Sequence, residues 1–258
     1  MSKGCDFVTY DLNVKIVRAL YFNKDKTWNY KGIVYPYNTV YFVIGGNGHI
    51  RTNGVTTDML PGYVYLIPPY VNHDIWCDTN VEKVFVDVYV EILPGYDVFL
   101  NTSCVLSQEI GLDRCKRLKQ LCCGGVREQL LLRGELESVL ADFVTSEPTE
   151  TSAKTASLIP IITYIQQNLS LHLRRDELAE RFGWNPSVLS RTFKQAFNCS
   201  LKQYIEKLLS ARIAEELILT DKTLRRLADE YGFCDAYYLS AYFKRCMGVS
   251  PLVFRGKK

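Results

Sequence analysis

Few side chains suited to catalysis or metal binding occur in this chain of 258 residues, and their spacing favours neither chemistry. The three histidines are His49, His73 and His172, and no two of them form a His-x-His pair. A catalytic metal needs several nitrogen, oxygen or sulfur ligands at matched spacing. The nine cysteines are scattered and odd in number, which favours reduced thiols over disulfides or a zinc cluster. We therefore expect no metal, no cofactor and no enzymatic activity.

Basic residues offer a different chemistry, because they gather in the C-terminal part of the chain. Residues 1–154 hold 15 Lys and Arg against 18 Asp and Glu, whereas residues 155–258 hold 16 against 10. Such an excess is typical of a module that binds phosphates, although a solvated surface produces it too. Where the charges lie on the helices therefore decides between these interpretations.

A repeat places part of this charge on two short helices. Leu189, Ser190, Phe193 and Lys194 recur 50 residues later, and Gly183 recurs 49 residues later as Gly232. In each copy an amphipathic helix ends at the glycine, which adopts a left-handed conformation at little cost. A second helix then starts at an N-cap, Asn185 or Asp235. This pattern is a helix-turn-helix, whose second helix is shaped to enter a DNA major groove. A simple packing hairpin has the same pattern, but two copies in a basic domain favour DNA binding.

The second helix of each unit is its reading helix, the one shaped to enter the major groove. Helical spacing separates the inward and outward faces of the two reading helices. Leu189 and Phe193 face inward, which leaves Arg191 placed for a bidentate contact to guanine and Lys194 for a phosphate. A surface salt bridge is the alternative for Arg191. The expected DNA-contacting residues are Asn185, Ser187, Ser190, Arg191, Lys194, Tyr237, Ser240, Ala241 and Lys244.

The string GFCDAYYLSAYFKRCMGVSPLVFR, residues 232–255, resembles the C-terminal signature of AraC/XylS-type transcription regulators. The resemblance covers about 158–255 and implies two helix-turn-helix units joined by a long helix, here 201–219. Members of that family bind promoter DNA in adjacent major-groove segments. Tyr237 stands where the family usually has Ser, and Ala241 stands where it usually has Arg. We therefore expect the second unit to read fewer bases directly.

The region from about Val14 to Ile92 alternates between apolar and polar residues, with hairpin signals such as Gly-Gly-Asn-Gly between the runs. This pattern predicts an antiparallel sheet that closes into a barrel or sandwich. Residues 41–76 resemble the cupin-like sensory domain of many AraC-type regulators, through Pro61-Gly62, Pro68-Pro69 and His73. An interior lined by aromatic residues suits a small polar molecule such as a sugar, although such residues also serve as plain core. The expected ligand-contacting residues are Trp28, Tyr30, Tyr41, His73 and Trp76.

Residues 106–144 show helical periodicity, and the polar stretch TSEPTETSAKTAS over 145–157 is typical of a linker. The apolar face of these helices predicts either contacts between two subunits or packing against the chain's own barrel. The expected dimerisation residues are Leu132, Leu136, Leu140 and Phe143. The first residues, up to about Asp11, form an arm that we expect to move when ligand binds.

The predicted fold is α+β and multidomain: an antiparallel cupin-like β-barrel with following helices, then an all-α domain with two helix-turn-helix units. The expected boundaries are 1–103 for effector binding, 104–144 for helical dimerisation, 145–157 for the linker and 158–258 for DNA binding. Together these features predict a cytoplasmic, homodimeric transcriptional activator with no signal peptide or membrane span. Its partners would be promoter DNA, RNA polymerase and a small-molecule effector, most simply a carbohydrate. The alternatives are a cupin-type enzyme and a sensor whose helical domain binds a protein.

Overall fold

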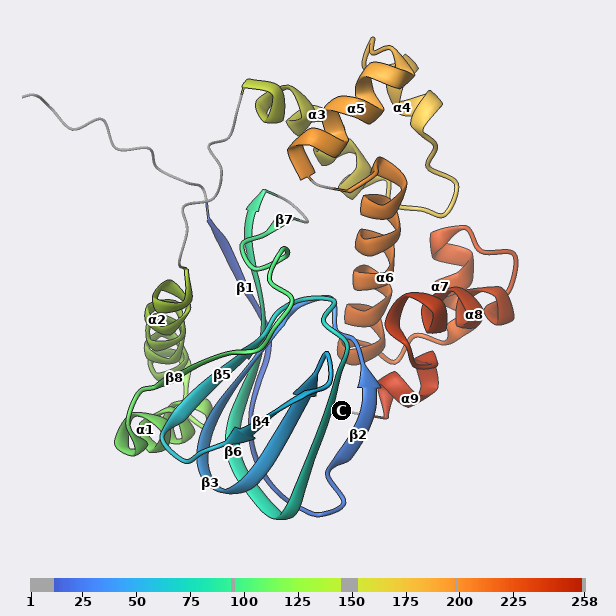
Figure 1. The fold of residues 1–258 in the computed structure, drawn as a ribbon. Helices are drawn as coiled ribbons and strands as arrows, with labels where there is room; N and C mark the ends of the chain where they lie inside the picture. The colour runs from blue at the N-terminus through green and yellow to red at the C-terminus, as the bar shows by residue number, and fades with distance from the viewer. Residues whose placement is uncertain (1–11, 94–95, 145–152, 198, 257–258) are drawn as a thin grey trace, which may run out of the picture.

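The computed structural model describes residues 12–93, 96–144, 153–197 and 199–256. An antiparallel sheet with two helices makes up the N-terminal part, and a group of helices makes up the C-terminal part, as the sequence predicts. Figure 1 shows the two parts side by side, with the sheet at the lower left and the later helices above it and to its right. The predicted N-terminal arm lies outside the described residues.

Eight strands form one sheet, and every pairing is antiparallel. The hydrogen-bonded order is β1-β6-β3-β5-β8, with β2 and β7 also on β6 and β4 also on β3. Bulges in β3 near Gly45 and Gly46 bend the longest pairing and let the sheet curl around an inner face. The strands are β1 Asn13–Asp25, β2 Asn29–Ile33, β3 Asn38–Thr52, β4 Val55–Met59, β5 Tyr63–Ile67, β6 His73–Leu93, β7 Tyr96–Asp97 and β8 Leu106–Glu109.

Two helices, α1 (Leu112–Cys122) and α2 (Val126–Phe143), cover the outer face of the sheet. The segment Leu106–Glu109, predicted as helical, is instead strand β8, because it pairs with β5 along its whole length. The predicted dimerisation face of α2 is buried against the chain's own sheet, which is the second of the two alternatives above. The buried side chains are Leu132, Leu136, Leu140 and Phe143, none more than 7% exposed.

The C-terminal part is helical throughout. Its helices are α3 Ala153–Gln167, α4 Arg175–Arg181, α5 Pro186–Phe197, α6 Leu201–Leu219, α7 Leu224–Tyr231, α8 Ala236–Met247 and α9 Pro251–Arg255. The joining helix α6 has the predicted bounds, and a capping box between Ser200 and Gln203 fixes its start. Helix α3 begins inside the predicted 145–157 linker, at Ala153.

The two helical units are anchored differently. The first unit, α3 to α5 with the start of α6, packs around its own core, which includes Leu178, Phe193 and Tyr204. The second unit shares one continuous core with the inner face of the sheet, because Ile213 of α6 and Phe254 of α9 join the same cluster as Tyr35 and Tyr37. The second unit therefore shares its core with the sheet, whereas the first unit meets the sheet domain through Tyr96 of β7, whose ring lies 5.3 Å from that of Phe197.

Polar contacts reinforce the interface between the sheet domain and α6. Lys15 of β1 pairs with Glu215 of α6 at 2.8 Å, and the Tyr70 hydroxyl donates to the carbonyl oxygen of Lys207 at 3.1 Å.

The eight cysteines of the described residues are all unpaired thiols. Within the same residues, no helix combines the length and the apolar character that crossing a bilayer requires.

Candidate nucleic-acid interface and ligand cavity

The first helix-turn-helix unit consists of α4 and α5, and local sequence fixes the turn between them. Gly183 has a φ of 68°, the left-handed conformation expected of it. The Asn185 side chain accepts hydrogen bonds from the backbone N–H of Ser187 at 3.0 Å and of Val188 at 3.3 Å, so it caps α5. Leu189 and Phe193 are fully buried under the helix. The inward face is thus the predicted one.

The second unit, α7 and α8, repeats this construction with different caps. Thr223 caps α7, Gly232 ends it with a φ of 76°, and Asp235 caps α8 by accepting from the Tyr238 N–H at 2.7 Å. Leu239 and Phe243 are buried, as their counterparts are in the first unit. Both reading helices therefore turn one apolar face inward and leave the opposite face to solvent.

The outward faces carry the residues predicted to contact DNA. Arg191, Lys194 and Lys244 are exposed, and among the described ion pairs none of the three takes part. Tyr237 is 88% exposed. The remaining positions lie on or beside the same faces, with Ser187 and Ala241 exposed and Ser190 and Ser240 half-buried. Asn185 is exposed too, but its side-chain oxygen is occupied by the cap.

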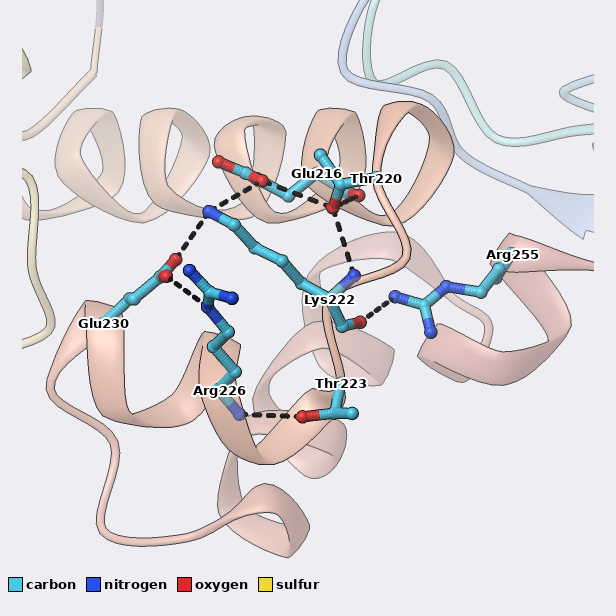
Figure 2. A network of polar contacts seen from close by, with 7 residues as sticks. All are labelled: Glu216, Thr220, Lys222, Thr223, Arg226, Glu230 and Arg255. Atoms are coloured by element: carbon cyan, nitrogen blue, oxygen red, sulfur yellow. Dashed lines mark hydrogen bonds and ion pairs between the residues drawn. The ribbon is translucent and has the colours of Figure 1, made fainter.

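A polar network holds the second unit on the joining helix, as Figure 2 shows. The Lys222 ammonium group lies 3.0 Å from Glu216 of α6 and 2.8 Å from Glu230 of α7. Arg226 also bonds Glu230, at 3.1 Å, and Arg255 of α9 donates to the carbonyl oxygen of Lys222. Single exposed pairs contribute little, but a network shares the ordering of its side chains. This network ties α6, α7 and α9 together.

The inner face of the sheet encloses a cavity of about 50 Å³. Strand β6 explains its chemistry, because alternate residues point to opposite faces of a sheet. Val84, Val86 and Val88 pack toward α1 and α2, whereas Lys83 and Asp87 line the cavity. The full lining is Arg18, Phe22, Trp28, Tyr30, Tyr35, Thr39, Tyr41, Ile75, Lys83, Phe85 and Asp87.

Three of the five predicted ligand-contacting residues, Trp28, Tyr30 and Tyr41, line this cavity. The other two lie elsewhere. The Nδ1 atom of His73 is 2.9 Å from the carbonyl oxygen of Val71, and the ring of Trp76 stacks on His49 at 5.0 Å. Among the described residues, no group of three or more His, Cys, Asp or Glu side chains is placed to hold a metal ion.

The sequence-based reasoning missed the charged residues of the cavity. Arg18 and Asp87 form a pair at 2.5 Å across β1 and β6, and Thr39 donates to Asp87 at 2.8 Å. Burial raises the pKa of Asp87, while the contacts with Arg18 and Thr39 oppose that shift. A sequence signal for Lys83 and Asp87 does exist. The two charged residues interrupt the valines of β6 four positions apart, so they lie on the same face of the strand.

Comparisons with known proteins agree with this geometry. A family model described as "Helix-turn-helix domain" matches residues 178–257. The multiple antibiotic resistance protein MarA of Salmonella typhimurium is 33% identical over 95 residues, which are 37% of this chain and 75% of that protein. The Msm operon regulatory protein of Streptococcus mutans is 20% identical over 245 residues, covering 90% of this chain and 88% of that one.

A solved structure of ToxT from Vibrio cholerae shares the fold across both parts. It superposes with a TM-score of 0.59 at 10% sequence identity and covers 95% of this chain and 98% of ToxT. The relatives, together with the shared fold, define a two-domain transcription regulator with a sheet domain and paired helix-turn-helix units. The chain belongs to the AraC/XylS family of regulators.

Proposed function

We propose that the protein binds promoter DNA by inserting α5 and α8 into successive major grooves. The observation that carries this proposal is the pair of matched, solvent-facing surfaces around Arg191 on α5 and Lys244 on α8. Each surface lies opposite a buried Leu and Phe pair, so both helices are held by their inner faces and are free on the outer ones. The match to a helix-turn-helix family model and the likeness to an operon regulatory protein support DNA over a protein partner.

Substitution of Arg191 tests direct base reading. Arg191→Ala should lose about 1–3 kcal/mol of discrimination at one base pair, roughly 5- to 150-fold in relative affinity. Fluorescence anisotropy with a set of single-base variants of the chain's own promoter region measures this. Arg133→Ala on α2, which removes an exposed arginine far from both reading helices, is the matched control. Uniform loss on every sequence would instead indicate a phosphate contact, and unchanged binding would show that Arg191 does not contact the DNA.

An effector response is the second part of the proposal. Tyr35 lines the cavity and meets Phe254 of α9 edge-on at 5.7 Å, and Phe254 meets Phe243 of the reading helix α8 at 5.3 Å. A ligand that moves Tyr35 would therefore act on the packing of α8. One solved structure of ToxT holds an unsaturated fatty acid, which supports small-molecule binding by a protein of this fold. The sequence favours a neutral sugar as this ligand.

We further propose that the protein activates transcription in the cytoplasm as a homodimer that contacts RNA polymerase. The relative AarP of Providencia stuartii, 27% identical over 105 residues, is described as a transcriptional activator. Dimerisation would double the phosphate contacts and link two binding sites by effective concentration. The apolar surface open to a second copy is the outer side of α2, where Val126 is 78% and Leu130 is 65% exposed.

A further inference from the structure

The buried amine of Lys83 sets the chemistry of the cavity. Its side chain is 1% exposed, and among the residues that the structure describes its Nζ atom has no hydrogen-bond partner. Ring faces are its neighbours instead: Nζ lies 3.1 Å from the ring centre of Trp28 and 3.9 Å from that of Tyr41. A buried polar group without a partner is destabilising, so its presence on the wall of a cavity points to a partner supplied from outside.

Charge balance indicates what that partner carries. The carboxylate of Asp87 is already held by Arg18 and Thr39, so this pair is neutral and, within the described part of the chain, no other carboxylate lines the cavity to balance Lys83. Burial lowers the pKa of Lys83 well below its usual range, against a weaker attraction to Cys77 and Asp87. Burial therefore favours the neutral form of this amine. The titratable groups around it are Arg18, Tyr30, Tyr35, Tyr41, Cys77 and Asp87.

The size of the cavity limits the group that can reach this amine. A volume of about 50 Å³ holds about three to five water molecules, which is enough for a carboxylate group. Phe22 and Tyr30 on the cavity wall are partly exposed, which gives the rest of a ligand an apolar and aromatic route to solvent. A sugar ring would stack on the face of an aromatic residue, but Lys83 already occupies one of the two faces of Trp28.

We propose that the effector is a small organic acid whose carboxylate pairs with the Nζ atom of Lys83. The inference rests on the proposed effector response and names the chemical class of the ligand. On binding, the neutral amine takes one proton from solvent, and the resulting ammonium group faces the carboxylate between the rings of Trp28 and Tyr41. These rings stabilise an ammonium group in addition to the ion pair. No covalent bond forms or breaks.

Proton uptake distinguishes this ligand class from a neutral one. The probes are acetate, hexanoate and phenylacetate, each compared with its own amide and with glucose. We expect the acids to raise the melting temperature of the full-length protein and the neutral compounds to leave it unchanged. Calorimetry in buffers of different ionisation enthalpy should show about one proton taken up per bound acid. The dissociation constant should then rise about tenfold per pH unit between the free and bound pKa values of Lys83.

A matched pair of lysine variants tests the position. Lys83→Met should fold, because an apolar chain of similar length replaces a buried amine, and should bind the same acid about 10- to 100-fold more weakly. Lys31→Met, which removes an exposed lysine of the neighbouring strand β2, should bind like the native protein.

Several results would overturn the inference: no stabilisation of the native protein by any acid, equal binding of the amides or of glucose, no proton uptake, or full binding by Lys83→Met. Promoter binding by the same preparations separates a failure of the proposed ligand class from a failure of the proposed DNA-binding function. A native protein that binds DNA but no acid refutes the ligand class alone. A native protein that binds no DNA refutes the proposed function.

Discussion

Gly248 ends the reading helix α8 at a point where the second helical unit touches the sheet, so Gly248→Ala tests how the two parts are joined. The residue has a φ of 73°, and a Cβ atom there would lie 2.9 Å from the carbonyl oxygen of Gly32 on β2. Left-handed backbone disfavours alanine by about 1 kcal/mol. The steric conflict with a backbone atom adds about 1–2 kcal/mol, because neither partner can rotate away.

Gly183→Ala supplies the control, because Gly183 follows a helix and has a left-handed φ of 68°, as Gly248 does. Nothing lies within 4 Å of the Cβ position at Gly183. It should therefore lose only the backbone term, about 1 kcal/mol, against about 2–3 kcal/mol for Gly248→Ala. Urea unfolding of the full chain measures the totals, and hydrogen exchange measures where the loss occurs.

Amide hydrogen exchange shows where the steric conflict, present only in Gly248→Ala, destabilises the protein. We expect amide exchange in β2 (Asn29–Ile33) and α9 (Pro251–Arg255) to quicken in Gly248→Ala and to stay native-like in Gly183→Ala. Equal stability losses with unchanged exchange in β2 would refute the close approach of the two parts. They would also remove the physical basis for a signal passing from the sheet to α8.

Three further predictions concern the sheet domain and its helix α2. Burial raises the pKa of Asp97 to about 7, above the value of about 3.9 in an unfolded chain, so the native state holds a proton that the unfolded state releases. Stability should therefore fall as pH rises from about 4 to about 7, and urea titrations should show a flatter profile for Asp97→Asn; identical profiles would contradict this. On α2, Leu136→Ala should lose about 2–5 kcal/mol of unfolding free energy because the side chain is fully buried. Leu130→Asp should leave stability nearly native but shift the proposed homodimer toward monomer in analytical ultracentrifugation, and a dimer that persists would place the interface elsewhere.

Local sequence determined the elements of the DNA-binding part. The repeated Leu and Phe spacing, the two glycines and the caps at Asn185 and Asp235 predicted both turns and the inward faces, because caps and helical periodicity act within a few residues. The bounds of α6 came instead from the resemblance to the AraC/XylS family, and the structure has the same bounds. The strand character of Leu106–Glu109 did not, because four residues carry too weak a pattern and only pairing with β5 decides it.

Tertiary structure decided which residues share the cavity and which helix faces remain open. Arg18 and Asp87 are 69 residues apart in the chain, and only the register of β1 on β6 makes them a pair. The apolar face of α2 had two equivalent uses in the sequence, and the sheet beneath it selected core packing. Helical spacing fixes the direction of a side chain on its own element, whereas its partner depends on how distant strands and helices pack.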